Sequence, residues 1–336
     1  MKIILQHKFD NLISVNNLLL AWQEFVRGKR SKKDVQEFSF YLMDNIFNLQ
    51  HELSNLTYKH GKYQEFKISD PKPRIIHKAS ARDRLLHHAV YRVLYPFFDK
   101  TFIADSYSCR NNKGTHKAID RFEQFARIVS KNNTKTCWIL KCDIKKFFAS
   151  IDQQTLIEIL QKRVRLSYDN QSINILNLLR EIIFSFKPNG LPLGNLTSQL
   201  FANVYLNEFD QFIKHKLKVK YYIRYADDFV VFSQSKTYLD SLITKIQEFL
   251  QIKLKLTLHP NKVFIDRLNS GVDFLGWVNF FGYRVLRNKT KNRMLKNVLR
   301  DSKKEKLASY IGLIKHGKAN AIKKEIFKIY DKKLFK

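Results

Sequence analysis

Two adjacent aspartates, Asp227 and Asp228, lie in the middle of the apolar stretch YYIRYADDFVVFS at residues 221–233. The flanking arms are rich in aromatic and β-branched residues, so they predict two strands joined by a tight turn at the aspartates. Two carboxylates about 4 Å apart repel each other by roughly 4 kcal/mol at an effective dielectric constant near 20. An ordinary Asp-containing turn explains one of the two residues, but arms without Gly or Asn are unusual for an exposed turn. The alternative is that the pair binds a cation.

A third aspartate, Asp143, ends the apolar run WILKCD at residues 138–143 and precedes a predicted helix. Taken alone, an Asp at this place is equally well explained as a helix N-cap. Together the three carboxylates offer the hard oxygen ligands that Mg²⁺ prefers. Phosphoryl-transfer sites often hold two such ions about 3.5–4 Å apart, one for the attacking oxygen and one for the leaving oxygen. The residues therefore predict metal-dependent phosphoryl transfer, by a polymerase or by a two-metal nuclease.

The charge of the chain indicates what such a site would act on. The formal net charge is +31, from 61 basic and 30 acidic residues. Such an excess favours a polyanionic partner, with nucleic acid ahead of an anionic membrane surface. No apolar run approaches the ~18 residues of a membrane span, and the first residues lack signal-peptide features. The three cysteines have neither zinc-site nor disulfide spacing, so we expect a reducing cytoplasm.

The elements that must position the aspartates change in type along the chain. Apolar residues at intervals of three and four predict helices in the first 60 residues. The remaining expected elements are a hairpin at 63–78, a helix at 79–102 that ends near Pro96, a strand at 137–143 that runs into a helix, a loop from 187 leading into a long helix, a helix at 237–254, and strands within 255–268 and 272–280. The tail from residue 284 holds 18 Lys and Arg residues and four acidic ones.

The motifs, in this order, resemble those of reverse transcriptases, and the resemblance extends from Tyr63 to Trp277. The segments that carry it are YADD at 225–228 (the catalytic Tyr-x-Asp-Asp hairpin), CDIKKFFASID at 142–152 (the first catalytic Asp), HPNK at 259–262 (the late palm segment), FLGW at 274–277 (the primer-gripping turn), and PKPRIIHKASARDR at 71–84 and DSYSCRNNKGTHKAI at 105–119 (two fingers segments of bacterial enzymes). Six ordered matches favour polymerisation over nuclease activity.

The resemblance implies an α+β fold of the right-hand polymerase type, with fingers, an antiparallel-sheet palm and a small helical thumb. We expect an N-terminal helical extension at 1–60, fingers and palm at 61–280, and a basic helical thumb at 281–336. The implied enzyme is an RNA-directed DNA polymerase, a nucleotidyltransferase that binds template RNA, cDNA and dNTPs. Its implied cofactor is Mg²⁺, as two ions, with Mn²⁺ as an alternative. The implied metal ligands are Asp143, Ile144, Asp227 and Asp228.

The resemblance also implies roles for residues around the three catalytic aspartates. Lys262 resembles the general acid for the departing pyrophosphate, although it could be a plain surface lysine. Phe148 matches the aromatic gate that rejects a ribose 2′-hydroxyl, although it could be a core residue beside Phe147. The expected substrate-binding residues are Arg74, Lys78, Arg82, Phe148, Leu193, Gly194 and Gln199. The expected nucleic-acid-binding residues are Arg110, Lys113, Gly276 and Trp277. The three fingers cations could equally contact template phosphates.

The loop before the long helix indicates which kind of reverse transcriptase this is. Most of these enzymes carry Gln-Gly-x-x-x-Ser-Pro there, whereas this chain has LGNLTSQ, in which Leu193 replaces the Gln and Gln199 replaces the Pro. The pattern resembles the reverse transcriptases of diversity-generating retroelements. That resemblance implies mutagenic retrohoming, with errors mainly at template adenines, and a small basic accessory protein that forms a helical-bundle oligomer. An apolar side chain cannot form the hydrogen bonds of the missing amide, so base selection would depend more on pairing.

Two other functions compete with this interpretation. The chain could be another bacterial reverse transcriptase, of the retron, phage-defence or truncated group II intron type. It could also be an RNA-binding protein that has lost catalysis, although all three aspartates and Lys262 are present.

Overall fold

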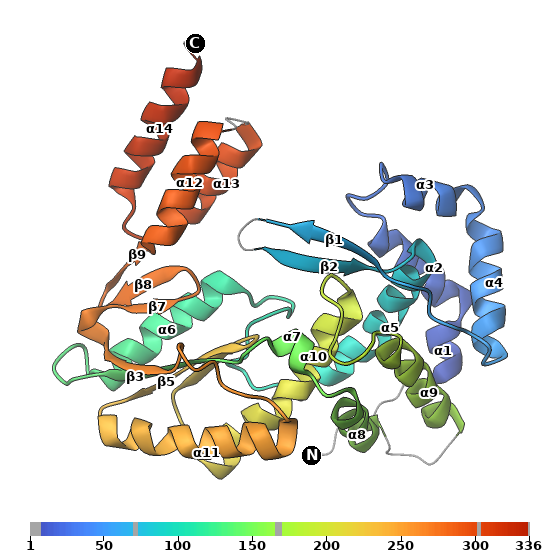
Figure 1. Cartoon of the computed structure of the whole chain (residues 1–336), viewed down its shortest axis with the longest axis horizontal. Helices are drawn as coiled ribbons and strands as arrows, with labels where there is room; N and C mark the ends of the chain where they lie inside the picture. The colour runs from blue at the N-terminus through green and yellow to red at the C-terminus, as the bar shows by residue number, and fades with distance from the viewer. Residues whose placement is uncertain (1–7, 70–72, 165–169, 301–303, 335–336) are drawn as a thin grey trace. The chain divides into compact units, whose positions relative to one another are not determined.

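Helices and antiparallel sheets make up the chain in the computed structural model, which describes residues 8–69, 73–164, 170–300 and 304–334 (Figure 1). This confirms the predicted α+β class. The contacts divide the chain into two compact units, Met1–Ala104, Ile144–Lys218 and Gln247–Leu258 in one, and Asp105–Asp143, Val219–Ile246 and His259–Lys336 in the other. Across the described ranges, no helix combines the length and the apolar character that crossing a membrane requires.

The first unit is mainly helical. Its elements are α1 (Phe9–Ile13), α2 (Val15–Phe25), α3 (Lys33–Phe40), α4 (Leu42–Ser54), β1 (Gln64–Ile68), β2 (Arg74–Lys78), α5 (Ala81–Asp99), α7 (Phe147–Ser150), α8 (Gln153–Val164), α9 (Asn170–Phe184), α10 (Leu196–Gln211) and a π-helical turn, η1 (Phe212–Lys216). The expected N-terminal helices and the hairpin after them are both present, although residues 1–7 and 70–72 of these segments lie outside the described ranges.

Helix α5 is the centre of this unit, because both α2 and α10 pack against it. The prediction that this helix ends near Pro96 is wrong, since α5 continues to Asp99 with Pro96 inside it. A proline within a helix costs about 3 kcal/mol. The two residues after it, Phe97 and Phe98, are 6% and 1% exposed. Burying each phenylalanine contributes about 1.5–3 kcal/mol, which is enough to offset the proline.

The second unit contains the larger sheets. Its elements are α6 (Thr115–Val129), β3 (Trp138–Asp143), β4 (Tyr222–Tyr225), β5 (Asp228–Ser233), β6 (Phe264–Arg267), a 3₁₀ turn, η2 (Leu268–Ser270), β7 (Val272–Phe274), β8 (Trp277–Phe280), β9 (Tyr283–Leu286), α12 (Asn288–Arg300), α13 (Lys304–Ile314) and α14 (Asn320–Leu334). Helix α11 (Lys236–Leu254) is shared between the two units. The predicted strand at 272–280 is in fact a hairpin, because Leu275 and Gly276 both adopt positive φ and reverse the chain.

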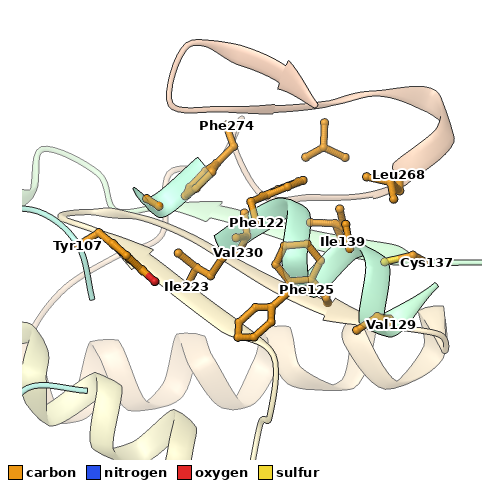
Figure 2. Close-up of a cluster of buried hydrophobic side chains, with 14 residues drawn as sticks. Tyr107, Phe122, Phe125, Val129, Cys137, Ile139, Ile223, Val230, Leu268 and Phe274 are labelled. Carbon is orange, nitrogen blue, oxygen red and sulfur yellow. The ribbon is translucent and has the colours of Figure 1, made fainter. Parts of the chain in front are cut away.

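The four-stranded sheet has the order β4-β5-β3-β6 and is antiparallel throughout. One face of it packs against α6 and the segment leading into β7 (Figure 2). Phe122 of α6 lies between the sheet and β7, with its ring centroid 4.8 Å from that of Phe232 and 5.6 Å from that of Phe274. Side chains alternate between the two faces along a strand. Lys141 and Asp143 therefore lie on the same face of β3 as Ile139, which belongs to this core.

The three C-terminal helices share a second apolar core with the β7-β8-β9 sheet. Trp277 lies in this core with residues of α12, α13 and α14, including Met294, Ile314 and Ile326. Gly317, in the turn between α13 and α14, packs directly on the indole, because a Cβ there would lie 2.2 Å from Trp277 Cζ3. The indole therefore anchors the basic C-terminal helices to the small sheet.

Candidate active site

The three aspartates come together at one end of the four-stranded sheet. Asp143, the last residue of β3, lies directly across from Asp228, the first residue of β5. Asp228 also pairs with Tyr225 on β4, so Ala226 and Asp227 form the two-residue turn between these strands. The expected hairpin is thus present, and a strand from elsewhere in the sequence brings the third carboxylate beside it.

Two lysines supply positive charge to these carboxylates. Lys262 Nζ lies 3.0 Å from both Oδ1 and Oδ2 of Asp143. The turn that carries Lys262 also bonds to the strand end, because the main-chain N–H of His259 donates to the Asp143 carbonyl at 2.7 Å. Lys141 Nζ lies 3.6 Å from Asp228 Oδ2. Lys262 and Asp143 thus form a two-point ion pair.

The electrostatic environment disfavours the charged form of Asp228. Burial is the main cause that raises the pKa of this carboxyl, to about 7, and the negative charges of Asp143, Asp227 and Asp273 add to the rise. Lys141 opposes it. In addition, the buried Oδ1 of Asp228 has no hydrogen-bond partner. A cation stabilises such a site, because it offsets the repulsion between clustered carboxylates and pairs with the unsatisfied buried oxygen.

The residues fit a divalent metal in kind, because they are carboxylates with an unsatisfied oxygen among them. As placed, however, no three His, Cys, Asp or Glu side chains within the described ranges converge closely enough to hold an ion. The two lysines supply the counter-charge instead, and Lys262 occupies both oxygens of Asp143. A metal bound by Asp143 would therefore compete with Lys262 for the same oxygens. Ile144 is 1% exposed, so only its main-chain carbonyl could take part.

The expected nucleic-acid contacts of the second unit lie in two places. Arg110 donates from Nη1 to the Ser106 carbonyl at 3.0 Å, and Lys113 Nζ lies 5.0 Å from the centroid of the Tyr107 ring. Gly276 is the second of two left-handed residues in the β7–β8 turn, with a φ of +87°. The side chain of Trp277 is buried in the C-terminal core, so a contact of this turn with nucleic acid would come from the main chain.

The expected phosphate-binding cations of the first unit differ in their surroundings. Arg74 is exposed on β2. Lys78 forms an ion pair with Asp34 of α3, Nζ to Oδ2 at 2.7 Å. The Arg82 guanidinium makes two bonds to Glu52 of α4, at 2.9 and 3.0 Å. Two of the three cations are thus neutralised by acidic residues of the N-terminal helices.

The remaining expected substrate residues lie on α7 and the loop before α10. Phe147 is 2% exposed while Phe148 is half-buried, so Phe147 is the core residue of the pair. The Leu193 carbonyl accepts from the main-chain N–H of His77 on β2 at 2.9 Å. Gly194 has a φ of +109°, and a Cβ there would lie 2.7 Å from Ile76. Gln199 is half-buried in the first turn of α10.

Three charged residues near the aspartates were missed by sequence reasoning. Lys141 pairs with Asp228, Asp273 of β7 contributes to its raised pKa, and Arg224 lies fully buried on β4. A signal was present for two of them. Lys141 and Arg224 each interrupt an apolar strand, where a charged side chain needs a specific partner. Asp273 had no such signal, because the expected turn at 274–277 does not indicate that β7 brings this residue near Asp228.

Comparisons with known proteins place the chain in a family. Residues 62–279 match the family described as reverse transcriptase (RNA-dependent DNA polymerase). The protein YkfC of Escherichia coli is 23% identical over 264 residues, which cover 66% of this chain and 66% of YkfC. The group II intron-encoded protein LtrA of Lactococcus lactis is 23% identical over 260 residues, which cover 58% of this chain and 42% of LtrA.

Among solved structures, telomerase from Candida albicans in complex with a TWJ fragment of telomeric RNA aligns with a TM-score of 0.52 and 12% identity. The alignment covers 82% of this chain and 55% of that chain. This likeness shows the fold alone, and it confirms the predicted right-hand polymerase class. The chain matches at most about two thirds of the length of these relatives.

Proposed function

The chain belongs to the reverse transcriptase family, and from this premise we propose that it copies an RNA template into cDNA from dNTPs. One observation carries the proposal. Asp143 and Asp228 face each other across two strands, and Asp227 lies in the turn beside them. The formal charge of +31 supports a nucleic-acid substrate, because lysine and arginine neutralise backbone phosphates.

The proposed chemistry assigns each group at the sheet end a role. Asp143, Asp227 and Asp228, with the Ile144 carbonyl, would hold the divalent ions. Bound ions would activate the primer hydroxyl and offset the charge that develops on the leaving pyrophosphate. Lys262 would leave Asp143 and give a proton from Nζ to that pyrophosphate. Phe148 would exclude a ribose 2′-hydroxyl by its bulk.

Primer extension tests the proposal. The purified protein, a primed RNA template, dNTPs and Mg²⁺ should give a longer DNA strand, and Asp227→Asn should abolish the product. Asp266→Asn is the matched control, because Asp266 lies on β6 opposite Ile139, away from the end of the sheet that carries the three aspartates. Shortening of the primer or template in place of extension would favour a two-metal nuclease. Binding of RNA without extension would favour an RNA-binding protein that has lost catalysis.

For the subtype, we propose a diversity-generating retroelement enzyme that copies template adenines with frequent errors and acts with a small basic accessory protein. The support is Leu193 in LGNLTSQ. Two hydrogen bonds join this loop to His77 of β2. The Leu193 carbonyl accepts from the His77 N–H, and the Asn195 side chain donates to the His77 carbonyl at 3.1 Å. The backbone would therefore stay in place when the side chain at 193 changes.

Sequencing of cDNA tests this subtype. Leu193→Gln should lower misincorporation opposite adenine relative to the other template bases, because the restored amide can hydrogen-bond. Leu193→Met, which stays apolar at similar volume, should keep the wild-type error spectrum. Equal spectra for all three proteins would contradict the proposal. The alternative is another bacterial reverse transcriptase of the intron, retron or phage-defence type, and the similarity to LtrA supports the intron type among these.

A further inference from the structure

Arg224 is an unusual residue for a buried position on β4, an edge strand of the four-stranded sheet. It is 0% exposed and lies on β4, three residues before Asp227. Its guanidinium donates in two directions, from Nη1 to the Ala226 carbonyl at 3.2 Å and from Nη2 to Ser106 Oγ at 3.0 Å. A buried cation is retained only where its bonds offset the loss of hydration. These two bonds link a loop of the second unit to the turn that carries the catalytic pair.

The turn needs such support, because Ala226 has a φ of +53°. Two-residue hairpin turns place Gly, Asn or Asp at left-handed positions, since a Cβ is unfavourable there. Alanine lacks that freedom. The bond from Arg224 to the Ala226 carbonyl fixes the peptide between Ala226 and Asp227, so the direction of both following carboxylates depends on it.

Arg224 is itself held by the segment before α6. Its main-chain N–H donates to the Asp105 carbonyl at 3.0 Å, and its own carbonyl accepts from the Tyr107 N–H at 2.9 Å. Asp105 is fixed in turn by Arg121 of α6, Nε to Oδ1 at 2.8 Å. Ser106, between these contacts, is 0% exposed, so its hydroxyl has a defined place beside the guanidinium.

We propose that Arg224 is a positioning residue for the catalytic turn, and that Ser106 positions Arg224. Arg224 holds the Ala226 carbonyl, and thereby sets where Asp227 and Asp228 present their oxygens to metal and substrate. This role rests on the proposed polymerase function. A planar guanidinium can span two acceptors at fixed angles, which a lysine ammonium on a flexible stem cannot do.

Three variants test the role. Arg224→Lys keeps the charge but loses the two-way bond, and Ser106→Ala removes one acceptor while Arg224 remains. Arg127→Lys is the matched control, because Arg127 lies on the same helix α6 but pairs with Glu123 and contacts neither Arg224 nor the segment that holds it. The measurements are the single-turnover rate of nucleotide addition, the dNTP concentration at half-maximal rate, Mn²⁺ binding by electron paramagnetic resonance, and the melting temperature.

Arg224→Lys should slow nucleotide addition by about 10–100-fold and weaken Mn²⁺ binding, while the half-maximal dNTP concentration changes less than about 3-fold. Ser106→Ala should show the same pattern at about 3–10-fold, with an unchanged melting temperature. Arg127→Lys should leave the rate and Mn²⁺ binding near wild type. If Arg224→Lys fails to fold, Ser106→Ala alone decides the question.

The double variant separates this role from general stability. If Ser106 acts through Arg224, adding Ser106→Ala to Arg224→Lys should cause no further loss of rate. The proposal would be overturned if the losses of the two single variants multiply in the double variant, or if Arg127→Lys causes an equal loss. A slower rate with unchanged Mn²⁺ binding in Ser106→Ala would also overturn it. Failure of the polymerase function itself would appear separately, as the absence of any extension by the wild-type protein.

Discussion

Single charged residues at the sheet end are balanced against one another. Burial and three neighbouring carboxylates raise the pKa of Asp228, and Lys141 offsets part of that rise. Asp143 is paired with Lys262 through both oxygens. The pairing supplies positive charge to Asp143, and in the proposed reaction it would place a proton donor beside the reacting groups.

The first prediction concerns the pH dependence of stability in chelator-treated protein. Asp228 has a pKa of about 7 when folded and near 4 when unfolded, so the folded form binds an extra proton between these values. The contribution of Asp228 to the free energy of unfolding should therefore fall by roughly 2 kcal/mol as the pH rises from 5 to 8. Urea titrations of the wild type and Asp228→Asn, subtracted at each pH, measure it.

The subtraction is needed because buried histidines titrate in the opposite sense. Burial lowers the pKa of His87 to about 3 and that of His88 to about 4, so both destabilise the fold as the pH drops below about 6.5. A difference between the two proteins that does not change with pH would contradict the assignment to Asp228.

The second prediction concerns Lys262. Lys262→Arg keeps a cation for Asp143, but a guanidinium does not release its proton near neutral pH. If Lys262 gives a proton to the leaving group, Lys262→Arg and Lys262→Met should both slow nucleotide addition, by about 100-fold. Rapid-quench kinetics measure this rate. A wild-type rate in Lys262→Arg would show that only the positive charge matters.

At the level of elements, local patterns predicted most of the fold. The strand arms around Asp227 and the helices of the first 60 residues repeat over short intervals that periodicity can detect. The residue pattern alone did not predict the β7–β8 hairpin, because Leu275 adopts a left-handed conformation that its residue type does not indicate, and only the motif resemblance gave a turn at 274–277. Helix α5 passes through Pro96 because of burial that only the tertiary structure provides.

Only the residues of the candidate site that lie in recognisable motifs were predictable from the sequence. The motif resemblance pointed to Asp143 as the partner of Asp227 and Asp228, and their register bears out the closeness of Asp143 and Asp228. The ion pairs of Lys78 with Asp34 and of Arg82 with Glu52 could not be read from the sequence. Contacts between residues far apart in the chain leave no fixed spacing, so charge patterns alone do not reveal them.

The third prediction concerns the anchoring of the C-terminal helices. Gly317→Ala would place a methyl group 2.2 Å from the Trp277 ring, so the free energy of unfolding should fall by about 1–3 kcal/mol. Gly312→Ala is the matched control, because nothing lies within 4 Å of its Cβ position on α13. That change should be neutral or stabilising by up to about 1 kcal/mol. Denaturant unfolding of both variants measures the difference, and equal stability would contradict it.

Over the whole molecule, positive charge is widespread but not randomly placed. On α12, basic residues at intervals of four, three and four form one stripe, which consists of Lys289, Arg293, Lys296 and Arg300. Met294 and Val298 of the same helix are buried in the C-terminal core. The exposed lysines of this stripe are therefore directed away from the core, where a nucleic-acid backbone can reach them.

The fourth prediction follows from that stripe. Replacing Lys289 and Lys296 together by alanine should lower the slope of log affinity against log salt for a primed RNA by about 2. The control replaces Lys245 and Lys253 of α11, which changes the net charge equally and should leave the slope nearly unchanged. Fluorescence anisotropy at several salt concentrations measures the slopes. Equal slopes for the two double variants would show that the contribution is not specific to α12.

The division into two units has a consequence for how the protein is made. The chain passes between the units after residues 104, 143, 218, 246 and 258. A ribosome therefore releases β3 before either of its sheet partners, β5 and β6, has been synthesised. The first unit is not complete until Leu258 has emerged from the exit tunnel. During translation the apolar strand that ends in Asp143 must stay unpaired in the nascent chain, and chaperones that bind such segments would find it exposed.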